Sequence, residues 1–331
     1  MDLTWLDPDQ LDSHDVAGAV AVLEAARLVD YPHQLGPIVS SFSARLRHGW
    51  DGDPSRVAVT RDGRGRVTGV LEVYLPHWDN THVGSVEVTV DPLARRQGLG
   101  RRLFEVGVEL IRADGRTVVL AGCWEQTPGV GFLKAMGLDR AADEVQRTQN
   151  LLTLDWVRLD REHAAAESRA SGYELVRMPG ATPDDMLSEV ARMTEAINDA
   201  PTDDLDIEDE VFSPERIRAF EGAQLALGRR IYRLVARERD TGVLAGHTMV
   251  AVESERPWHG WQLDTSVQRS HRGHRLGLYL KTAMLHWLRD EQSQLRTIDT
   301  WNAASNAHMI GVNEILGYRV VAHATEWQRH L

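Results

Sequence analysis

The sequence is poor in cysteine and contains no long apolar run. Cys123 is the only cysteine among 331 residues, which excludes an intrachain disulfide and any zinc cluster built on cysteines and favours a reducing compartment. No run approaches the roughly 18 apolar residues of a membrane span, and the acidic first residues lack the apolar core of a signal peptide. We therefore expect a cytoplasmic protein that needs neither a membrane nor a metal ion.

Basic residues are also in deficit. Lys and Arg number 37 against 49 Asp and Glu, which gives a formal net charge of -12. Tight binding to nucleic acid needs a dense basic surface that neutralises many phosphates, so we expect no nucleic-acid partner. With 42% hydrophobic and 26% charged residues the composition is that of a globular protein, and the length indicates two domains.

Against this acidic background one short segment is strongly basic. Four arginines surround Gly98 and Gly100, after an alternating apolar run and before a helical one. A loop that leads from a strand into a helix N-terminus is suited to anions, because its N–H groups are unpaired and the helix dipole favours negative charge. The spacing R-x-x-G-x-G, which begins at Arg95, is neither that of a P-loop nor the dinucleotide-binding fingerprint.

The same pattern occurs a second time. In the first copy Glu87 lies eight positions before Arg95, and in the second copy Asp264 lies eight positions before Arg272. A glycine follows five positions after each arginine, and the next helix in each copy has apolar residues at i, i+3, i+4, i+7 and i+8. Such an internal repeat indicates two copies of one fold.

Each copy has the order helix, hairpin, strand, basic loop, helix, strand, helix, strand. Hairpin turns are expected at 63–65 and 240–242, and Gly137 and Gly317 are expected to end short helices. The polar, Ala-rich stretch 155–175 is expected to join the copies. The pattern predicts an α/β (α+β) fold with two tandem domains, 1–164 and 165–331, each a mixed, largely antiparallel sheet flanked by helices.

The basic loop and the strand before it, residues 86–92, resemble motif A of the GNAT superfamily of acetyl-CoA-dependent N-acyltransferases, whose pattern is Q/R-x-x-G-x-G/A. The resemblance covers both halves, so the chain looks like a tandem GNAT with the layout of mycothiol synthase. In that family the loop holds the coenzyme A pyrophosphate, and the strand before it splays from the next strand to admit the pantetheine arm. The resemblance therefore implies acetyl-CoA as co-substrate.

The resemblance places the coenzyme A contacts on the two loops, on the strand ends before them and on one asparagine. For Asn306 a plain helix N-cap is an equally open interpretation. Backbone N–H groups of the strand residues would also polarise the thioester carbonyl. The expected contact residues are Val88, Thr89, Val90, Arg95, Arg96, Gln97, Gly98, Leu99 and Gly100 in the first copy, and Thr265, Ser266, Val267, Arg272, Gly273, His274, Arg275, Leu276, Gly277 and Asn306 in the second.

Two carboxylates at matched positions are the candidate catalytic bases. An alkyl amine with a pKa of about 10 is mostly protonated at pH 7, so a carboxylate near the acceptor would help to remove the proton, directly or through a water. Glu87 and Asp264 occupy this position, although a solvated or ion-paired strand residue stays open for each.

The residue that would protonate the leaving thiolate differs from the family pattern in both copies. Many members protonate the thiolate with a Tyr, but the matching residues here are Leu133 and Asn313. Asn313 is kept as a catalytic candidate, because a thiol with a pKa of about 8.5 can leave as thiolate with hydrogen-bond help alone. The first copy also has Gln126 where the second has Asn306, and the second has Arg275 in place of the first glycine of its loop.

The segment 198–212 of the second copy is crowded with carboxylates and contains no Lys or Arg. In the family this region covers the acceptor groove, so the segment would form a lid that favours a cationic amine; a solvated charge run is the alternative. The first copy has no such cluster. We therefore expect the second domain to be catalytic and the first to be degenerate or structural, with a loop that still binds coenzyme A.

Three functions stay open. The leading prediction is transfer of an acetyl group from acetyl-CoA to the primary amine of a small cationic molecule. The alternatives are acetylation of a protein N-terminus or lysine, and a non-catalytic acyl-CoA-binding sensor. The expected partner is thus a small-molecule amine, and the two domains are expected to form an intramolecular pseudo-dimer, which suits a monomeric protein.

Overall fold

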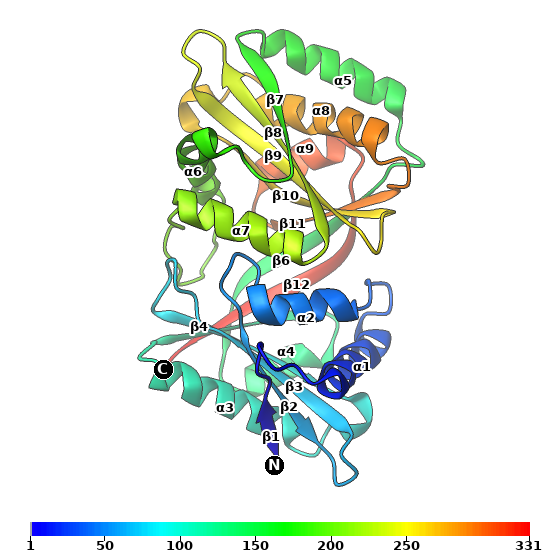
Figure 1. The fold of residues 1–331 in the computed structure, drawn as a ribbon, viewed down its shortest axis with the longest axis vertical. Coiled ribbons are helices and arrows are strands. Elements are labelled where there is room, and N and C mark those ends of the chain that lie inside the picture. Colours follow the sequence, from blue (N-terminus) through cyan, green and yellow to red (C-terminus); the bar gives the residue numbers. More distant parts are fainter. Residues whose placement is uncertain (1) are drawn as a thin grey trace. The chain divides into compact units, whose positions relative to one another are not determined.

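The computed structural model describes residues 2–331, which divide into two compact units. Unit 1 contains the residues up to Asp143 together with the segments Thr202–Asp209 and His323–Leu331. Unit 2 contains Glu144–Pro201 and Glu210–Ala322. Each unit is a mixed, mostly antiparallel sheet with helices on both faces (Figure 1), as the repeat predicts.

Within residues 2–331, the sheet of unit 1 has six strands, of which only β4 and β5 form a parallel pair. In spatial order the strands are β1 (Leu3–Trp5), β2 (Arg56–Arg61), β3 (Val67–Tyr74), β4 (Val83–Val90), β5 (Val118–Trp124) and β12 (Arg319–His330).

Helices cover both faces of this sheet. Helices α1 (Ser13–Asp30) and α2 (Val39–His48) pack on one face, and α3 (Leu99–Ala113) and α4 (Pro128–Ala135) pack on the other. The apolar stripe predicted for this helix faces the sheet, and its residues Leu103, Gly107 and Ile111 are buried.

Unit 2 repeats this plan. Its strands in spatial order are β6 (Asp139–Asn150), β11 (Thr297–Ala303), β10 (His259–Val267), β9 (Leu244–Glu253), β8 (Arg229–Glu238) and β7 (Tyr173–Pro179), with β10 and β11 parallel. Helices α5 (Trp156–Arg169), α8 (Leu276–Glu291) and α9 (Ala307–Ile315) lie on one face, and α6 (Leu187–Thr194) and α7 (Pro214–Ala226) lie on the other.

The last strand of each sequence copy completes the sheet of the other unit. Strand β12, from the end of the chain, pairs with β5 in unit 1, and the second half of β6 pairs with β11 in unit 2. Asp299 on β11 accepts hydrogen bonds from Gln146 (2.9 Å) and Thr148 (2.5 Å) on β6, which fixes this pairing with buried polar groups. The order of elements along the chain does not indicate this exchange.

Most local predictions are confirmed. The hairpin turns lie between β2 and β3 and between β8 and β9, and Gly137 and Gly317 adopt φ of 77° and 81° after their helices. The stretch 155–175, which the sequence predicts to join the two copies, contains a helix: 14 of its residues form α5, which packs on α8. A boundary at 164 and 165 would cut this helix, and that boundary stays a prediction. Among residues 2–331, no helix combines the length and the apolar character needed to cross a membrane.

Candidate active site

In unit 1, strands β4 and β5 separate partway along their length. They pair only where Val83–Ser85 lies beside Val118–Leu120. Beyond this point β4 continues to pair with β3 as far as Val90, while β5 pairs with β12 as far as Trp124. The edge of β4 from Val88 to Val90 therefore faces a gap in the ladder rather than a partner strand.

The same divergence occurs in unit 2. Strand β10 pairs with β11 only from His259 to Trp261, and Thr265–Val267 pairs with β9 alone. The register of β10 against β9 shifts between Gln262 and Thr265, which places Asp264 in a β-bulge. A bulge re-aims the side chains it contains, so Asp264 differs in setting from Glu87, whose strand pairs regularly with β3.

The first basic loop is an open anion cradle. Arg96 and Gly98 adopt φ of 63° and 79°, and α3 begins directly afterwards at Leu99. Within residues 2–331, the N–H groups from Arg96 to Gly100 donate no hydrogen bond. Unpaired N–H groups at a helix N-terminus are suited to a phosphate.

The arginines of this loop have two different roles. Arg95 makes a bidentate ion pair with Asp30 (2.8 and 2.7 Å) and donates through Nε to the Val90 carbonyl oxygen (3.2 Å), so it ties the loop to α1 and β4. Arg96, Arg101 and Arg102 are exposed and pair with no carboxylate of the described chain. These three cations are available to a polyanion.

The arginines of the second loop are paired with carboxylates of the protein, and Asp199 serves both Arg269 and Arg272. Arg272 pairs with Asp199 (2.5 Å) and donates through Nε to the Val267 carbonyl oxygen (3.0 Å), which copies the bracing of Arg95. Arg275, with φ of 57°, pairs with Glu162 (3.2 Å). The positions that correspond to Arg101 and Arg102 hold Leu278 and Tyr279, both buried, so the loop offers N–H groups but little net positive charge.

Two carboxylates meet on the face of the unit 1 sheet that carries α1 and α2. Glu72 on β3 is the direct cross-strand partner of Glu87 on β4, and the pKa of Glu87 is raised to about 7. The nearby charge of Glu72 is the main cause and removal from water is the second, while Arg45 opposes both. Arg45 on α2 holds Glu72 at 2.9 Å, whereas Glu87 remains open to solvent on one side although nearby protein atoms remove part of its hydration.

Asp264 lies in a more closed setting. Burial raises its pKa, and the charges of Arg233 and Arg216 oppose this shift. Arg233 is only 2% exposed and donates hydrogen bonds to Glu221 (2.9 Å) and Thr182, so these groups form a buried ionic cluster beside Asp264. The repeat places Met249 where the first copy has Glu72, and unit 2 therefore has one carboxylate in place of a pair.

The asparagines and the leucine singled out by the family pattern make contacts within the protein. Leu133 packs in the core of unit 1. Asn313 is fully buried, accepts a hydrogen bond from Lys281 (2.7 Å) and donates one to Asn302 (2.8 Å). Asn306 caps α9 by accepting from the Met309 N–H at 3.2 Å, as its N-cap interpretation expects. The carboxamide of Asn313 is thus occupied inside the protein.

The central part of the acidic segment, Thr202–Asp209, belongs to unit 1. The Asp204 N–H donates to the Ala141 carbonyl oxygen (3.0 Å), and the Glu208 N–H donates to Asn80 (2.6 Å). These contacts give no support to a lid over the acceptor groove of unit 2, which was the reason for expecting catalysis there.

Glu72 is the site residue that sequence reasoning missed. The alternation of Leu71, Glu72 and Val73 places Glu72 on the face opposite the α3 core. That pattern could have marked it as a polar residue on the helix α1 side of the sheet. Only the register of β3 against β4 brings it opposite Glu87.

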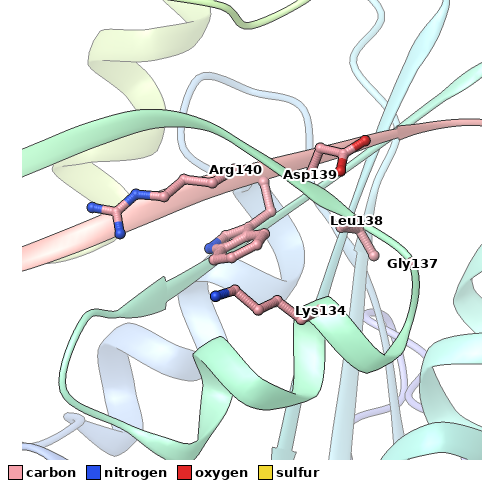
Figure 2. Close-up of a pocket in the computed structure, with 6 residues that line it drawn as sticks. Lys134, Gly137, Leu138, Asp139 and Arg140 are labelled. Carbon is pink, nitrogen blue, oxygen red and sulfur yellow. The ribbon is translucent and has the colours of Figure 1, made fainter.

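A separate pocket of 480 Å³ opens at the C-terminal end of α4. The Lys134 ammonium lies 5.9 Å from the centroid of the Trp327 ring. Figure 2 shows the extended side chains of Lys134 and Arg140 at this pocket. Arg140 pairs with Glu125 and Asp143. No residue that lines this pocket belongs to the loop or to the carboxylate pair.

The chain matches the model of the acetyltransferase (GNAT) family twice, over residues 26–138 and 193–318. Comparison with curated protein sequences found no match.

Solved structures resemble the whole chain. A tandem GNAT protein from the clavulanic acid biosynthesis pathway is 28% identical with a TM-score of 0.80, and the match covers 99% of this chain and 98% of that one. A GCN5-related N-acetyltransferase from Sphaerobacter thermophilus is 15% identical with a TM-score of 0.65, covering 99% and 95%. A glucosamine N-acetyltransferase region of a fungal multi-domain beta-N-acetylglucosaminidase is 13% identical with a TM-score of 0.71, covering 99% and 38%.

Proposed function

Because the chain belongs to the GNAT acetyltransferase family, whose co-substrate is an acyl-CoA, we propose that it transfers an acetyl group from acetyl-CoA to the primary amine of a small cationic molecule. We place this transfer in unit 1. The carboxylate pair of Glu72 and Glu87, beside a loop with unpaired N–H groups and arginines, is the observation that carries the proposal.

The residues of the first loop fit acetyl-CoA. The N–H groups from Arg96 to Gly100 would hold the pyrophosphate, and the exposed guanidinium groups of Arg96, Arg101 and Arg102 would add charge-assisted contacts to the phosphates. The gap between β4 and β5 would admit the pantetheine arm. When bound, acetyl-CoA supplies a thioester carbonyl that is open to attack by an amine.

The carboxylate pair would bind and deprotonate the acceptor. Glu72 and Glu87 together attract an ammonium group, and Arg45 offsets part of the charge of Glu72. With its pKa near 7, Glu87 is partly ionised at neutral pH and can accept the amine proton, which is the condition for an efficient general base. Backbone N–H groups between Val88 and Val90 would polarise the carbonyl.

Two observations favour a small acceptor and unit 1. The tandem relative at 28% identity belongs to the biosynthesis of a small molecule, which supports a small-molecule acceptor over a protein. In unit 2 the loop arginines are paired internally and Asp264 faces buried arginines, so we propose a secondary or structural role for that unit. The expectation that the second domain is catalytic is not supported by this asymmetry.

One pair of variants tests both the activity and its location. A Cβ atom at Gly100 would meet Phe132 at 3.5 Å and Val90 at 3.6 Å, and one at Gly277 would meet nothing within 4 Å, so the fold has room for the start of a side chain at both positions. Gly100→Trp and Gly277→Trp would each block the approach of a phosphate to their own loop. We expect thiol release from acetyl-CoA, measured over a panel of amines, to fall at least about tenfold further in Gly100→Trp.

Other outcomes separate the alternative functions. A sensor would show a rise in melting temperature with acetyl-CoA but no thiol release with any amine. A protein acetyltransferase would release thiol with peptides and not with small amines. A larger loss in Gly277→Trp than in Gly100→Trp would move the active site to unit 2 and give Asp264 the role of the base.

A further inference from the structure

The end of helix α1 is anchored to the end of strand β4. Asp30, the last residue of α1, accepts both guanidinium N–H groups of Arg95 at 2.8 and 2.7 Å. The Nε of the same arginine donates to the carbonyl oxygen of Val90, the last residue of β4. A bidentate ion pair fixes orientation as well as distance, so the end of α1 is held beside the strand end that leads into the basic loop.

Tyr31, the next residue, contacts the end of the other strand of the gap. Its ring packs at a tilt against Trp124, the last residue of β5, with centroids 5.3 Å apart and an interplanar angle of 34°. The turn that carries it is braced by Arg27, which donates to the carbonyl oxygens of Pro32 (2.8 Å) and Gln34 (2.7 Å). Tyr31 is thus held at the end of the gap between β4 and β5.

The phenol of Tyr31 is available as a proton donor. Within residues 2–331, its hydroxyl group makes no hydrogen bond. Burial is the main cause that raises its pKa, followed by the negative charges of Asp30 and Glu87, while Arg27 and Arg95 oppose the shift. A raised pKa keeps the phenol protonated at neutral pH.

Unit 2 has the same anchor but lacks the tyrosine. Asp199 braces Arg272 as Asp30 braces Arg95, and the residue after Asp199 is Ala200. Trp301 occupies the position on β11 that Trp124 occupies on β5. The two units therefore differ in one phenol at an otherwise repeated position.

We infer that Tyr31 is the catalytic acid of unit 1, which donates its proton to the thiolate that leaves during acyl transfer. This inference rests on the proposed function. A bond forms between the amine nitrogen and the carbonyl carbon, and the C–S bond breaks with its electron pair on sulfur. The phenol proton passes to that sulfur. Glu87 releases to solvent the proton that it took from the ammonium group, and then accepts the second nitrogen proton, which the amine loses as the C–N bond forms. Proton transfer from Glu87 to the tyrosinate through solvent restores both groups. Tyr31, directly after α1, then takes the role that Leu133 on α4 cannot fill.

Tyr31→Phe tests this role while it keeps the ring contact with Trp124. We expect kcat to fall about 10- to 100-fold with little change in the KM for acetyl-CoA, because general acid catalysis contributes about this much or more. Wild-type kcat should decrease at high pH as the phenol loses its proton, and this decrease should be absent in Tyr31→Phe. The matched control is Tyr173→Phe, which removes another phenol whose pKa is raised by burial and should leave kcat and its pH profile unchanged.

A second readout does not depend on turnover. The pKa of the thiol of enzyme-bound coenzyme A, followed by ultraviolet absorbance of the thiolate, should rise by about one unit in Tyr31→Phe, because a hydrogen bond to the thiolate is lost. An unchanged thiol pKa together with an unchanged alkaline limb would overturn the inference. If the wild-type protein releases no thiol with any amine, the proposed function fails first, and the two failures are thus distinguished.

Discussion

Glu72 on β3 lies directly opposite Glu87 on β4, and Arg45 on α2 holds Glu72 at 2.9 Å. Two like charges at directly paired positions destabilise a sheet, so this arrangement costs stability where a pair of opposite charge would add it. In return, the repulsion moves the pKa of Glu87 to about 7, where a base is most useful at neutral pH.

The acid limb of the pH profile should respond in opposite directions to two substitutions. Glu72→Gln removes the charge that raises the pKa of Glu87, so the limb in kcat/KM should move about one unit to lower pH. Arg45→Gln removes the opposing positive charge, and the limb should move to higher pH. Steady-state rates across the pH range measure both shifts. If both variants moved the limb in the same direction, electrostatic control of Glu87 by this pair would be refuted.

Replacement of Glu87 should reduce activity and increase stability. In Glu87→Gln, kcat should fall about 10²- to 10⁴-fold, because the general base is lost. The ordinary pKa of 4.5 is raised to about 7 in the folded protein, so the stability contributed by this carboxyl is fully present below pH 4.5 and is lost as the pH rises through about 7.

In Glu87→Gln the side chain does not ionise, so this loss of stability at high pH does not occur. At pH 8 the melting temperature should rise by about 2–4 °C, which corresponds to about 1 kcal/mol once solvent screening of this exposed side chain is taken into account. Below pH 4.5 the variant and the wild type should melt alike. Calorimetry at the two pH values makes the comparison, and a variant that is less stable than the wild type at pH 8 would contradict the strain assigned to the pair.

Coenzyme A affinity should depend on the arginines at the start of α3. Arg101→Gln combined with Arg102→Gln should raise the Kd for acetyl-CoA about tenfold or more, because charge-assisted contacts to phosphate are lost. Arg112→Gln, an exposed arginine in the last turn of the same helix, is the matched control for net charge. Titration calorimetry at two salt concentrations measures the Kd of each variant. An equal loss of affinity in the double variant and in Arg112→Gln would show that the effect comes from net charge and not from contacts to the phosphates.

Buried Lys281 in unit 2 should make stability depend on alkaline pH. Burial lowers its pKa from 10.5 to about 7, so between these values the unfolded chain holds a proton that the folded protein lacks. The free energy of unfolding should therefore rise as the pH increases from about 7 to 10.5. Lys281→Met should remove this rise. Denaturant titrations at pH 7 and pH 9 test it, and a Lys281→Met protein with the wild-type pH dependence would disprove it.

Short-range patterns in the sequence were enough to predict the repeated fold. The turns at Gly65 and Gly242, the glycines that end α4 and α9, and the apolar stripe of α3 depend on neighbours a few residues away. The basic loops could be located for the same reason, because strand, loop and helix start are contiguous in the chain.

Contacts between distant segments could be decided only by the tertiary structure. Glu72 faces Glu87 because of the register between two strands, and a shift of one residue would send one carboxylate to the opposite face of the sheet. Tyr31 meets Trp124 because Asp30 and Arg95 anchor the end of α1. Burial of a side chain and the charge of its neighbours are properties of packing between segments, and such packing sets which of two similar loops has free cations and which carboxylate has its pKa raised to about 7.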